Sequence, residues 1–545
     1  MLSAWSCLVF AALARTDEPP SVVIGQGLLK GTYLQSRGGR VFSAFQGIPY
    51  AEPPVGLLRF QRPQSPKPWE GVLDATKPGS PCLQPLHMVH LKGQIIGDEN
   101  CLFLNVYTHK PSNTSRSPVL VYIHGGGFIE GRGDMHQPHF LMDKDIVLVT
   151  LNYRLGPLGF LSLEERELPG NNGLKDQSLA LRWVRDNIAQ FGGDPNTVTI
   201  MGNSAGGASV HYHTLSPLSK GLFHRAITQS GTAYCPWAIS APGQQQLIGE
   251  RFAADFSCNH HNVADTLECL RDMPGYVLIE VAQTMHEWDF DPIVPFTPVI
   301  EPEGVEGAFL TTDPWKLSSD VPLIAGLMSS EAIFRVKMFN EQKIIELNDD
   351  FEVIGPLTLL FRATADDPVH TAFAVKKFYF LDGDITPTSE EGLLQMYSDA
   401  WFNYAVLESF RRHQGPKYLY HFAYRGANSI VPGHSGVSHF DEMQYLFKLD
   451  DYFTKGYGSY NETAEDTKFS EKIIDLWTNF VIHGKPTKPT SEVTWDESKS
   501  GSEYLHIKQD GFSMKKDLYK DRYDFWHKLS FREKYLSEKS EKDEL

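Results

Sequence analysis

Apolar runs alternate with helical stretches along this chain. Five short runs are rich in apolar and β-branched residues, are bounded by turn residues, and are expected to form strands. They span residues 119–123, 146–152, 198–201, 323–327 and 418–422. Helical patterns lie between them, and this alternation is typical of a largely parallel sheet with helices on both faces. The pattern therefore predicts an α/β fold.

Two of the intervening segments carry clear helix signals. In residues 174–191, apolar side chains recur every three to four positions, and the glycines at 192–193 end the pattern. A second helix is expected over residues 471–483, where Gly484 stops it. The sequence has no internal repeat and no low-complexity linker. We therefore expect one compact domain.

Composition narrows the possible functions. Of 545 residues, 41% are apolar and 21% are charged, which is typical of a folded globular chain. Lys and Arg number 50 against 67 for Asp and Glu, so the formal net charge is −17. An acidic surface repels phosphate groups, which argues against nucleic acid or an anionic membrane as a partner.

The N-terminus predicts a secretory signal peptide over residues 1–14. An apolar run stops at Arg15, and Ala12 and Ala14 fit the A-x-A pattern of a cleavage site, although no basic residue precedes the run. Elsewhere the sequence has no uninterrupted apolar stretch of about 18 residues, the length that a spanning helix needs. We therefore expect no membrane span.

The C-terminus predicts a subcellular location. Residues 542–545 read Lys-Asp-Glu-Leu, the tetrapeptide that a receptor reads as an endoplasmic reticulum retention signal. Together with a signal peptide, this tetrapeptide predicts the lumen of the endoplasmic reticulum as the location and the retention receptor as a partner.

That compartment is oxidising, so disulfides are expected. Cys7 leaves with the signal peptide, and five cysteines remain. An odd number leaves one thiol outside intramolecular pairs, and fifteen arrangements stay open. Short sequence separations favour the pairs Cys82–Cys101 and Cys258–Cys269.

Other short motifs concern glycosylation and metals. Asn113-Thr-Ser and Asn461-Glu-Thr are glycosylation sequons, which the lumen would permit. The sequence contains no C-x-x-C, H-E-x-x-H or C-x-x-C-H pattern. We therefore expect neither a zinc nor a haem centre.

Residues 202–206 read Gly-Asn-Ser-Ala-Gly, a match to G-x-S-x-G. In a nucleophile elbow, flanking glycines permit a sharp turn between a strand and a helix, and the central serine is exposed at the top of the sheet. A glycine-rich turn containing serine also occurs for purely structural reasons. Here an expected strand precedes the motif and a helix-compatible segment follows it, which favours a nucleophile at Ser204.

A glycine run, His124-Gly-Gly-Gly-Phe128, follows the expected strand at 119–123. Hydrolases with a nucleophile elbow need backbone N–H groups from an early loop to bind an oxyanion, and glycines let that backbone approach the substrate. The alternative is an ordinary flexible loop. Both motifs occur in the order that the hydrolase interpretation requires.

Beyond these motifs, the sequence resembles the type-B carboxylesterase and cholinesterase family, in particular its juvenile-hormone-esterase-like and microsomal carboxylesterase members. The strings that carry the resemblance run through nearly the whole chain: FQGIPYAEPPVG from Phe45, DENCLFLN from Asp98, NYRLG from Asn152, GLKDQSLALRWV from Gly173 and DFW from Asp524. The resemblance implies an α/β hydrolase domain over residues 15–541, with a large, mostly parallel central sheet and a deep active-site gorge.

The resemblance also implies a catalytic triad of Ser204, Glu331 and His439, in the nucleophile–acid–base order of this architecture. The histidine would take the serine proton, and the glutamate would orient the imidazole and stabilise its cation. Ser230 matches a family position that supports the acid. No cofactor is implied.

The same resemblance assigns an oxyanion hole to the N–H groups of Gly126, Gly127 and Ala205. Phe296 aligns with a position that lines the acyl pocket, although an ordinary core role remains an alternative for it.

The family also implies the two local disulfides, a free thiol at Cys235, and a buried ion pair between Arg59 and Glu99.

Three positions depart from the family pattern. Asn203 stands before the serine where many relatives carry an acidic residue, and the segment between Cys82 and Cys101 contains no tryptophan. Cholinesterases use a tryptophan there to bind quaternary ammonium by cation–π attraction, so acetylcholine is disfavoured as substrate. Ala332 replaces a glycine that usually follows the acid, and its Cβ is expected to affect the local turn.

The sequence therefore predicts a serine carboxylesterase that hydrolyses uncharged lipophilic esters through an acyl-enzyme intermediate. One alternative is an esterase specific for juvenile hormone; however, hormone esterases often carry Gln before the nucleophile and are secreted. The other is a non-catalytic adhesion or scaffold protein of the superfamily. Such members usually lose a triad residue, whereas this chain keeps all three.

Overall fold

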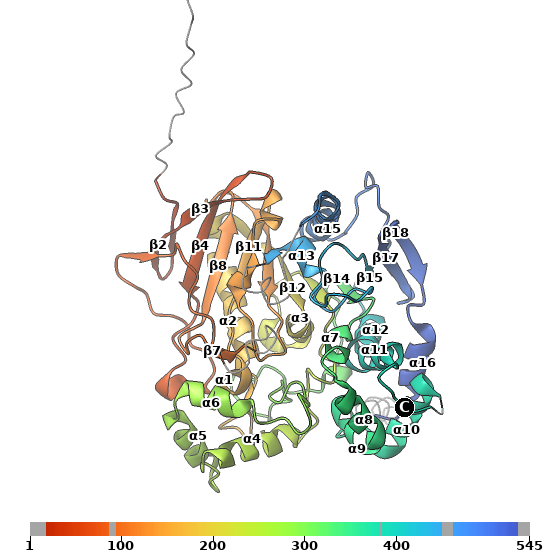
Figure 1. The fold of residues 1–545 in the computed structure, drawn as a ribbon. Coiled ribbons are helices and arrows are strands. Elements are labelled where there is room, and N and C mark those ends of the chain that lie inside the picture. The colour runs from red at the N-terminus through yellow and green to blue at the C-terminus, as the bar shows by residue number, and fades with distance from the viewer. Residues whose placement is uncertain (1–17, 87–93, 382, 450–461, 532–545) are drawn as a thin grey trace, which may run out of the picture.

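The computed structural model describes residues 18–86, 94–381, 383–449 and 462–531. Within them an eleven-stranded sheet has the order β18-β17-β15-β14-β13-β12-β9-β11-β8-β4-β3. Its strands are β3 (Thr32–Gln35), β4 (Val41–Pro49), β8 (Phe103–Thr108), β9 (Ser117–Ile123), β11 (Val147–Leu151), β12 (Gly193–Asn203), β13 (Arg225–Gln229), β14 (Leu323–Met328), β15 (Lys417–Ala423), β17 (Glu503–Lys508) and β18 (Gly511–Lys516). The sheet crosses the molecule in Figure 1.

The central strands are parallel and the edges are antiparallel. Strands β11, β9, β12, β13, β14, β15 and β17 pair in parallel, and β18, β8, β4 and β3 add antiparallel edges. All five strands expected from the sequence lie in the parallel centre. The prediction of an α/β hydrolase sheet is confirmed.

The centre of the sheet is buried on both faces, which is why its strands read as continuous apolar runs. Successive side chains of a strand point to opposite faces. In β9, Val119, Val121 and Ile123 belong to one hydrophobic core, and Leu120 and Tyr122 belong to the other. The sheet therefore separates two cores.

Helices cover both cores. On one face lies α2 (Asn172–Asn187), which a 3-10 turn continues to Phe191, so the helix expected over 174–191 is confirmed. On the other face lies α15 (Ala464–His483), which begins seven residues before the expected 471. Its start is a capping box, because the side chains of Thr463 and Asp466 each accept a hydrogen bond from the other's backbone N–H. The first turn of α15 is polar and lacks the apolar periodicity of a helix, so the sequence pattern placed the start of the helix too late.

The described residues also form further helices and smaller sheets. The helices are α1 (Gly156–Phe160), α3 (Ala205–Leu215), α4 (Gln244–Asp255), α5 (Val263–Asp272), α6 (Gly275–Ala282), α7 (Ile333–Val336), α8 (Glu341–Asp349), α9 (Phe351–Thr358), α10 (Pro368–Phe380), α11 (Glu390–Ser398), α12 (Tyr404–Arg412), α13 (Met443–Leu446) and α16 (Lys520–Lys528). Smaller sheets use β1 (Ser21–Ile24), β2 (Gly27–Lys30), β5 (Val72–Asp74), β6 (Gln84–Pro85), β7 (Ile95–Ile96), β10 (His136–Gln137) and β16 (Lys448–Leu449).

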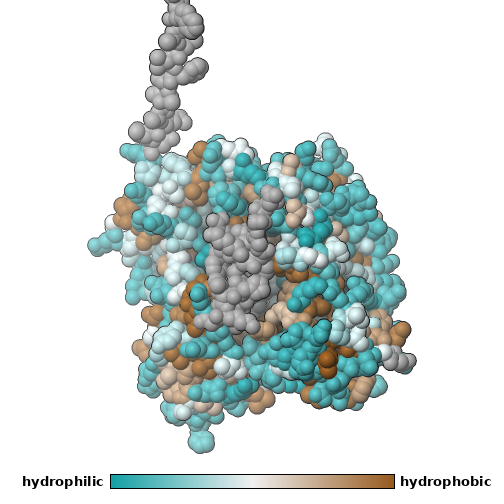
Figure 2. All heavy atoms as spheres, in the orientation of Figure 1, coloured by the Kyte–Doolittle hydropathy of each residue, from teal (hydrophilic) through white to brown (hydrophobic). Residues whose placement is uncertain are grey.

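The face drawn in Figure 2 is largely hydrophilic, with hydrophobic residues scattered over it. None of the helices in the described part of the chain is long and apolar enough to cross a bilayer.

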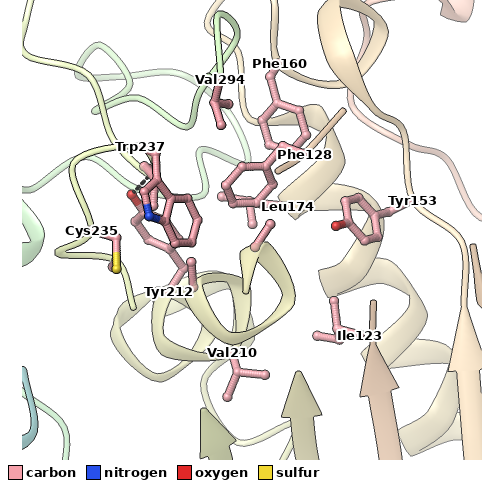
Figure 3. Packing of buried hydrophobic residues seen from close by; sticks show 14 of the residues in the cluster. Ile123, Phe128, Tyr153, Phe160, Leu174, Val210, Tyr212, Cys235, Trp237 and Val294 are labelled. Carbon is pink, nitrogen blue, oxygen red and sulfur yellow. Dashed lines mark hydrogen bonds between the residues drawn. The ribbon is translucent and has the colours of Figure 1, made fainter. Parts of the chain in front are cut away.

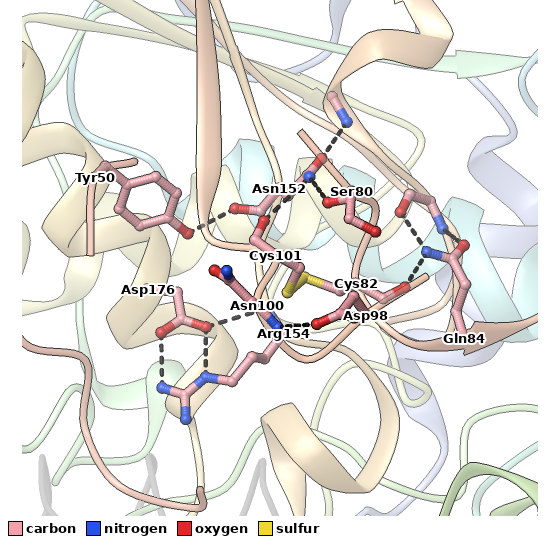
Figure 4. The surroundings of a disulfide bond; sticks show 12 residues. Tyr50, Ser80, Cys82, Gln84, Asp98, Asn100, Cys101, Asn152, Arg154 and Asp176 are labelled. Carbon is pink, nitrogen blue, oxygen red and sulfur yellow. Dashed lines mark hydrogen bonds and ion pairs between the residues drawn. A yellow bond between two sulfur atoms is a disulfide. The ribbon is translucent and has the colours of Figure 1, made fainter. Parts of the chain in front are cut away.

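Two disulfides form, between Cys82 and Cys101 and between Cys258 and Cys269, and Cys235 is a buried free thiol. Burial raises the pKa of that thiol to about 12, so it stays protonated and unreactive. Figure 4 draws the first disulfide with its neighbours. The cysteine assignment made from the sequence agrees with the structure.

The expected ion pair connects the two disulfide loops. Arg59 donates to both carboxylate oxygens of Glu99, which lies inside the Cys82–Cys101 loop. The same guanidinium donates to the carbonyls of Arg271 and Met273, which follow Cys269. One buried cation thus joins loops that are far apart in the sequence.

A second buried ion pair links the sheet to helix α2. After β11, Arg154 donates through Nε and Nη2 to the Asp176 carboxylate at 2.8 and 2.7 Å, and both side chains are buried (Figure 4). The backbone N–H of Arg154 also donates to Asp176 at 3.0 Å. Removing one partner of such a pair leaves an uncompensated charge in the interior.

We expect Asp176→Asn to lower the free energy of unfolding by about 3–5 kcal/mol, because Arg154 stays buried without a counter-charge. Urea unfolding at neutral pH measures this loss. Asp186→Asn, on the same helix, removes an exposed pair with Arg185, and its effect should stay below about 1 kcal/mol. Equal effects of the two substitutions would contradict the prediction.

Candidate active site

Ser204 occupies the turn between β12 and α3. Its backbone has φ 59° and ψ −124°, a conformation that side-chain-bearing residues rarely adopt. Every residue from Val198 to His213 is buried except Ser204, which is partly exposed. The turn therefore presents this one side chain at the carboxyl end of the central strand.

Glycines make that turn possible. A Cβ at Gly206 would overlap the carbonyl oxygen of Ile123, and a Cβ at Gly202 would overlap the backbone of Gly206. On the other side, a Cβ at Gly231 would overlap the Ser204 carbonyl. The strand, the turn and the helix approach one another more closely than a side chain permits.

The glycine run packs directly against this elbow. A Cβ at Gly125 would lie 2.5 Å from the Asn203 carbonyl oxygen and 3.1 Å from the Ser204 Cβ. Gly126 and Gly127 have φ 110° and 61°. Among the described residues, no acceptor takes a hydrogen bond from the N–H of Gly126, Gly127 or Ala205. These donors are therefore available to an anion beside the serine.

Glu331 and His439 meet across 108 residues of sequence. His439 Nδ1 donates to Glu331 Oε2 at 2.7 Å, and the His439 backbone N–H donates to the Glu331 carbonyl at 3.3 Å. Glu331 is fully buried, and its Oε1 accepts from the Met328 N–H at 2.8 Å. With Nδ1 committed to the carboxylate, Nε2 is the nitrogen left to accept a proton.

Two aromatic rings hold the imidazole in place. The ring centroid of His439 lies 4.5 Å from that of Phe402 and 5.7 Å from that of Phe334. His439 is only 8% exposed. An imidazole that is buried against two aromatic rings and hydrogen-bonded at Nδ1 has little freedom to rotate.

Within the described residues, no direct hydrogen bond joins Ser204 to His439; a buried carboxyl connects their loops instead. Glu442, three residues after His439, accepts from Asn203 Nδ2 at 3.1 Å and from Gln229 Nε2 at 3.2 Å through the same Oε1. The Gln229 carbonyl in turn accepts from the Ser204 N–H at 2.8 Å. Sequence reasoning missed Glu442 and Gln229, because nothing local distinguishes them.

Glu442 lies in an environment that disfavours its charge. Complete burial, with the Glu331 and Asp441 carboxylates nearby, raises the pKa of Glu442 to about 8. Burial and the Glu442 charge also raise the pKa values of Tyr122 and Tyr420. The carboxyl is therefore protonated at neutral pH and holds the elbow as a neutral hydrogen-bonding group.

Ser230 and Ala332 differ from expectation in part. Ser230 is buried beside the site, but its hydroxyl has no hydrogen-bond partner among the described residues, and Glu331 is held by Met328 instead. Ala332 has φ −91° and ψ 15°, and its N–H donates to Ser398 Oγ at 3.0 Å. Any residue adopts that conformation, so the Cβ expected to affect the turn causes no strain.

Trp237 and Val294 are among the side chains near the glycine run at residues 125–127. A Cβ at Gly127 would lie 3.6 Å from Val294, and the Trp237 ring centroid lies 6.5 Å from that of Phe128 and 5.8 Å from that of Phe402. Figure 3 shows Trp237, Phe128 and Val294 gathered at one end of the core. Phe296 is buried and packs against Phe252 at 5.2 Å. The sequence analysis had singled out Phe296 but not Trp237 or Val294.

Among the described residues, no group of three or more His, Cys, Asp or Glu side chains could hold a metal ion.

Comparisons with known proteins agree on one family. Residues 18–526 match the model of the carboxylesterase family. Esterase FE4 of Myzus persicae is 38% identical over 90% of this chain and 89% of its own, and juvenile hormone esterase of Tribolium castaneum is 34% identical over 96% of both. The crystal structure of juvenile hormone esterase from Manduca sexta, with OTFP covalently attached, superposes with a TM-score of 0.81. It is 29% identical, and the match covers 94% of this chain and 99% of that one.

We expect Glu442→Gln to flatten the pH dependence of stability. Because the pKa of Glu442 is raised in the folded state, its contribution to stability is present at low pH and is lost as pH rises from about 4.5 towards 8. Gln keeps an acceptor for Asn203 and Gln229 but cannot ionise. The free energy of unfolding of the variant, relative to that of the wild type, should therefore increase between pH 5 and pH 8.

Urea unfolding at pH 5, 6.5 and 8 measures this difference. The exposed Glu268 provides the control, since Glu268→Gln should leave the pH profile unchanged. A Glu442→Gln profile parallel to that of the wild type would refute the assignment.

Proposed function

This chain belongs to the carboxylesterase family, and we propose from that premise that Ser204 attacks uncharged, lipophilic carboxylic esters and forms an acyl-enzyme intermediate. The observation that carries the proposal is the exposure of Ser204 alone in an otherwise buried segment, beside three N–H groups without acceptors. A fully buried serine cannot reach a substrate. An exposed serine without N–H donors nearby has no group to bind the negative charge that develops during attack.

Acylation needs a base, because a serine hydroxyl is a poor nucleophile at neutral pH. His439 Nε2 takes the Ser204 proton as Oγ bonds to the ester carbonyl carbon, and the same proton passes to the leaving alcohol. Water then repeats the sequence on the acyl-enzyme and releases the acid. Glu331, at 2.7 Å from Nδ1, fixes the tautomer and stabilises the imidazolium.

The tetrahedral intermediate carries its negative charge on the former carbonyl oxygen. The N–H groups of Gly126, Gly127 and Ala205 would donate to this oxygen, and the loss of one such donor typically costs about 10²–10³ in rate. Because the loop and the elbow are packed together, these donors need no rearrangement when the charge develops. No residue of this scheme requires a cofactor.

The substrate class follows from the surroundings of the serine. Asn203 is neutral where a charged residue would attract a cation, and no tryptophan lies between Cys82 and Cys101. Trp237 and Val294, which lie near the proposed oxyanion loop of residues 125–127, are apolar. These features favour an uncharged ester with apolar acyl and alcohol groups. Phe296 is buried against Phe252, and we propose that it supports the acyl pocket through this contact.

A juvenile hormone ester is the second candidate substrate. It is supported by the names of relatives, since proteins called juvenile hormone esterase match over most of this chain in sequence and in structure. Such hormones belong to the same class of uncharged lipophilic ester. An adhesion or scaffold function has no comparable support.

We expect Ser204→Ala to lower kcat on a short p-nitrophenyl ester by about 10⁶, as loss of the nucleophile does in serine hydrolases. Its unfolding transition should match that of the wild type. An organophosphate should add one phosphoryl group to the wild type and none to the variant, as seen by intact mass. Ser65→Ala, at an exposed serine, is the matched control. Retained turnover in Ser204→Ala would remove the nucleophile assignment.

We also propose that the protein works in the lumen of the endoplasmic reticulum, with residues 1–14 removed as a signal peptide and residues 542–545 bound by the retention receptor. Both segments, like the sequon at Asn461, lie outside the described residues. Asn113 is exposed in the connection between β8 and β9, where a glycan would face solvent.

Deletion of residues 542–545 should move the protein from the cell into the medium, because the receptor reads only that tetrapeptide. Immunoblots of cells and medium measure the partition. The same tetrapeptide added to a secreted reporter should retain it. If the truncated protein stays in the cell as the intact one does, the retention signal is not functional.

A further inference from the structure

A cavity of about 310 Å³ lies behind the wall of the candidate active site. Helix α4, the segment that follows α9, and helix α12 surround it. Its floor is apolar and includes Trp237, Met285, Val294, Leu357 and Ala405. That volume and character are typical of a site for a lipophilic small molecule.

The cavity is separate from the reacting groups. None of the proposed catalytic or oxyanion residues lines it. Trp237 and Val294 form the partition, since both line the cavity and both also approach the oxyanion loop. The indole of Trp237 is held by a hydrogen bond of 2.8 Å from Nε1 to the Trp401 carbonyl. A molecule in the cavity therefore occupies space distinct from the serine site.

Charged side chains mark the mouth of the cavity. Arg251, Glu287 and Arg362 line it and are all exposed. Arg362 donates twice to the Glu287 carboxylate, at 2.7 and 2.6 Å, so those two charges neutralise each other. Arg251 donates to the Thr284 carbonyl at 3.3 Å, and its positive charge also acts on the Glu287 carboxylate. Two arginines therefore face one carboxylate at the entrance.

We propose that this cavity binds a fatty acid, with the hydrocarbon chain inside and the carboxylate at Arg251. An apolar interior whose entrance carries one net positive charge, from two arginines and one glutamate, matches an amphipathic anion. A neutral alcohol of the same length would gain only the apolar contacts. The inference concerns binding and does not depend on the esterase activity.

The test is a titration of dodecanoate, below its micellar concentration, into full-length protein whose active-site serine has been blocked with diisopropyl fluorophosphate. Calorimetry should give one bound dodecanoate per chain, and dodecanol should bind more weakly. Intact mass reports the phosphorylation separately, so a failure of the nucleophile assignment is distinguishable from a failure of binding. If dodecanoate binds only before the serine is blocked, the ligand lies in the gorge and the proposal is wrong.

Two variants locate the ligand. Ala363 lines the cavity and is half-buried, so Ala363→Trp should fill the space and weaken both ligands at least tenfold. Arg251→Gln should weaken dodecanoate by about two- to fivefold and leave dodecanol unchanged, as expected for an exposed charge pair. Arg185→Gln, at an exposed arginine that pairs with Asp186, is the matched control.

Thermal unfolding checks that each variant is folded. Unchanged binding in folded Ala363→Trp would exclude the cavity as the site. Equal weakening of dodecanoate and dodecanol in Arg251→Gln would exclude the arginine as the carboxylate partner.

Discussion

The close approach of three backbones around Ser204 is the constraint on which the rest of this site depends. The end of β9, the β12–α3 turn and the connection after β13 meet at distances that a Cβ would violate at Gly202, Gly206 and Gly231. This contact forces the serine into a positive φ and leaves its side chain facing out of a buried segment. It also brings the glycine run against the elbow, where the N–H groups of Gly126 and Gly127 have no acceptor within the described part of the chain.

Polar groups buried behind the turn fix its relation to the histidine loop. Glu442 accepts hydrogen bonds from the side chains of Asn203 and Gln229. Asn203 directly precedes Ser204, and the Gln229 carbonyl accepts a hydrogen bond from the Ser204 N–H. A charged Glu442 would repel the nearby Glu331 carboxylate in a buried region where water cannot screen the two charges. The raised pKa of Glu442 favours its neutral form and so reduces this repulsion. The neutral Asn203 suits this arrangement, because an acidic residue there would add another negative charge near the Glu331 carboxylate.

Local signals predicted the parts of the molecule that local physics controls. The parallel strands read as apolar runs because both faces of the sheet are covered, and the two glycine motifs stand out because few sequences need so many residues without Cβ atoms. Glu331 and His439 were found only through the family resemblance, since 108 residues separate them. Glu442, Gln229, Trp237 and Val294 were not found, and the Ser230 hydroxyl makes no hydrogen bond among the described residues.

By itself, the sequence determined the fold class, the elbow, the glycine loop and the short-range disulfides, because each of these follows from residues close together in the chain. Only the tertiary structure decided which buried carboxyl joins the Ser204 turn to the Glu331–His439 pair, which side chains line the neighbouring cavity, and which charged groups lie at its entrance. Those features depend on how strands and loops from distant parts of the chain pack. The distances at which these distant segments pack leave no local pattern in the amino-acid sequence.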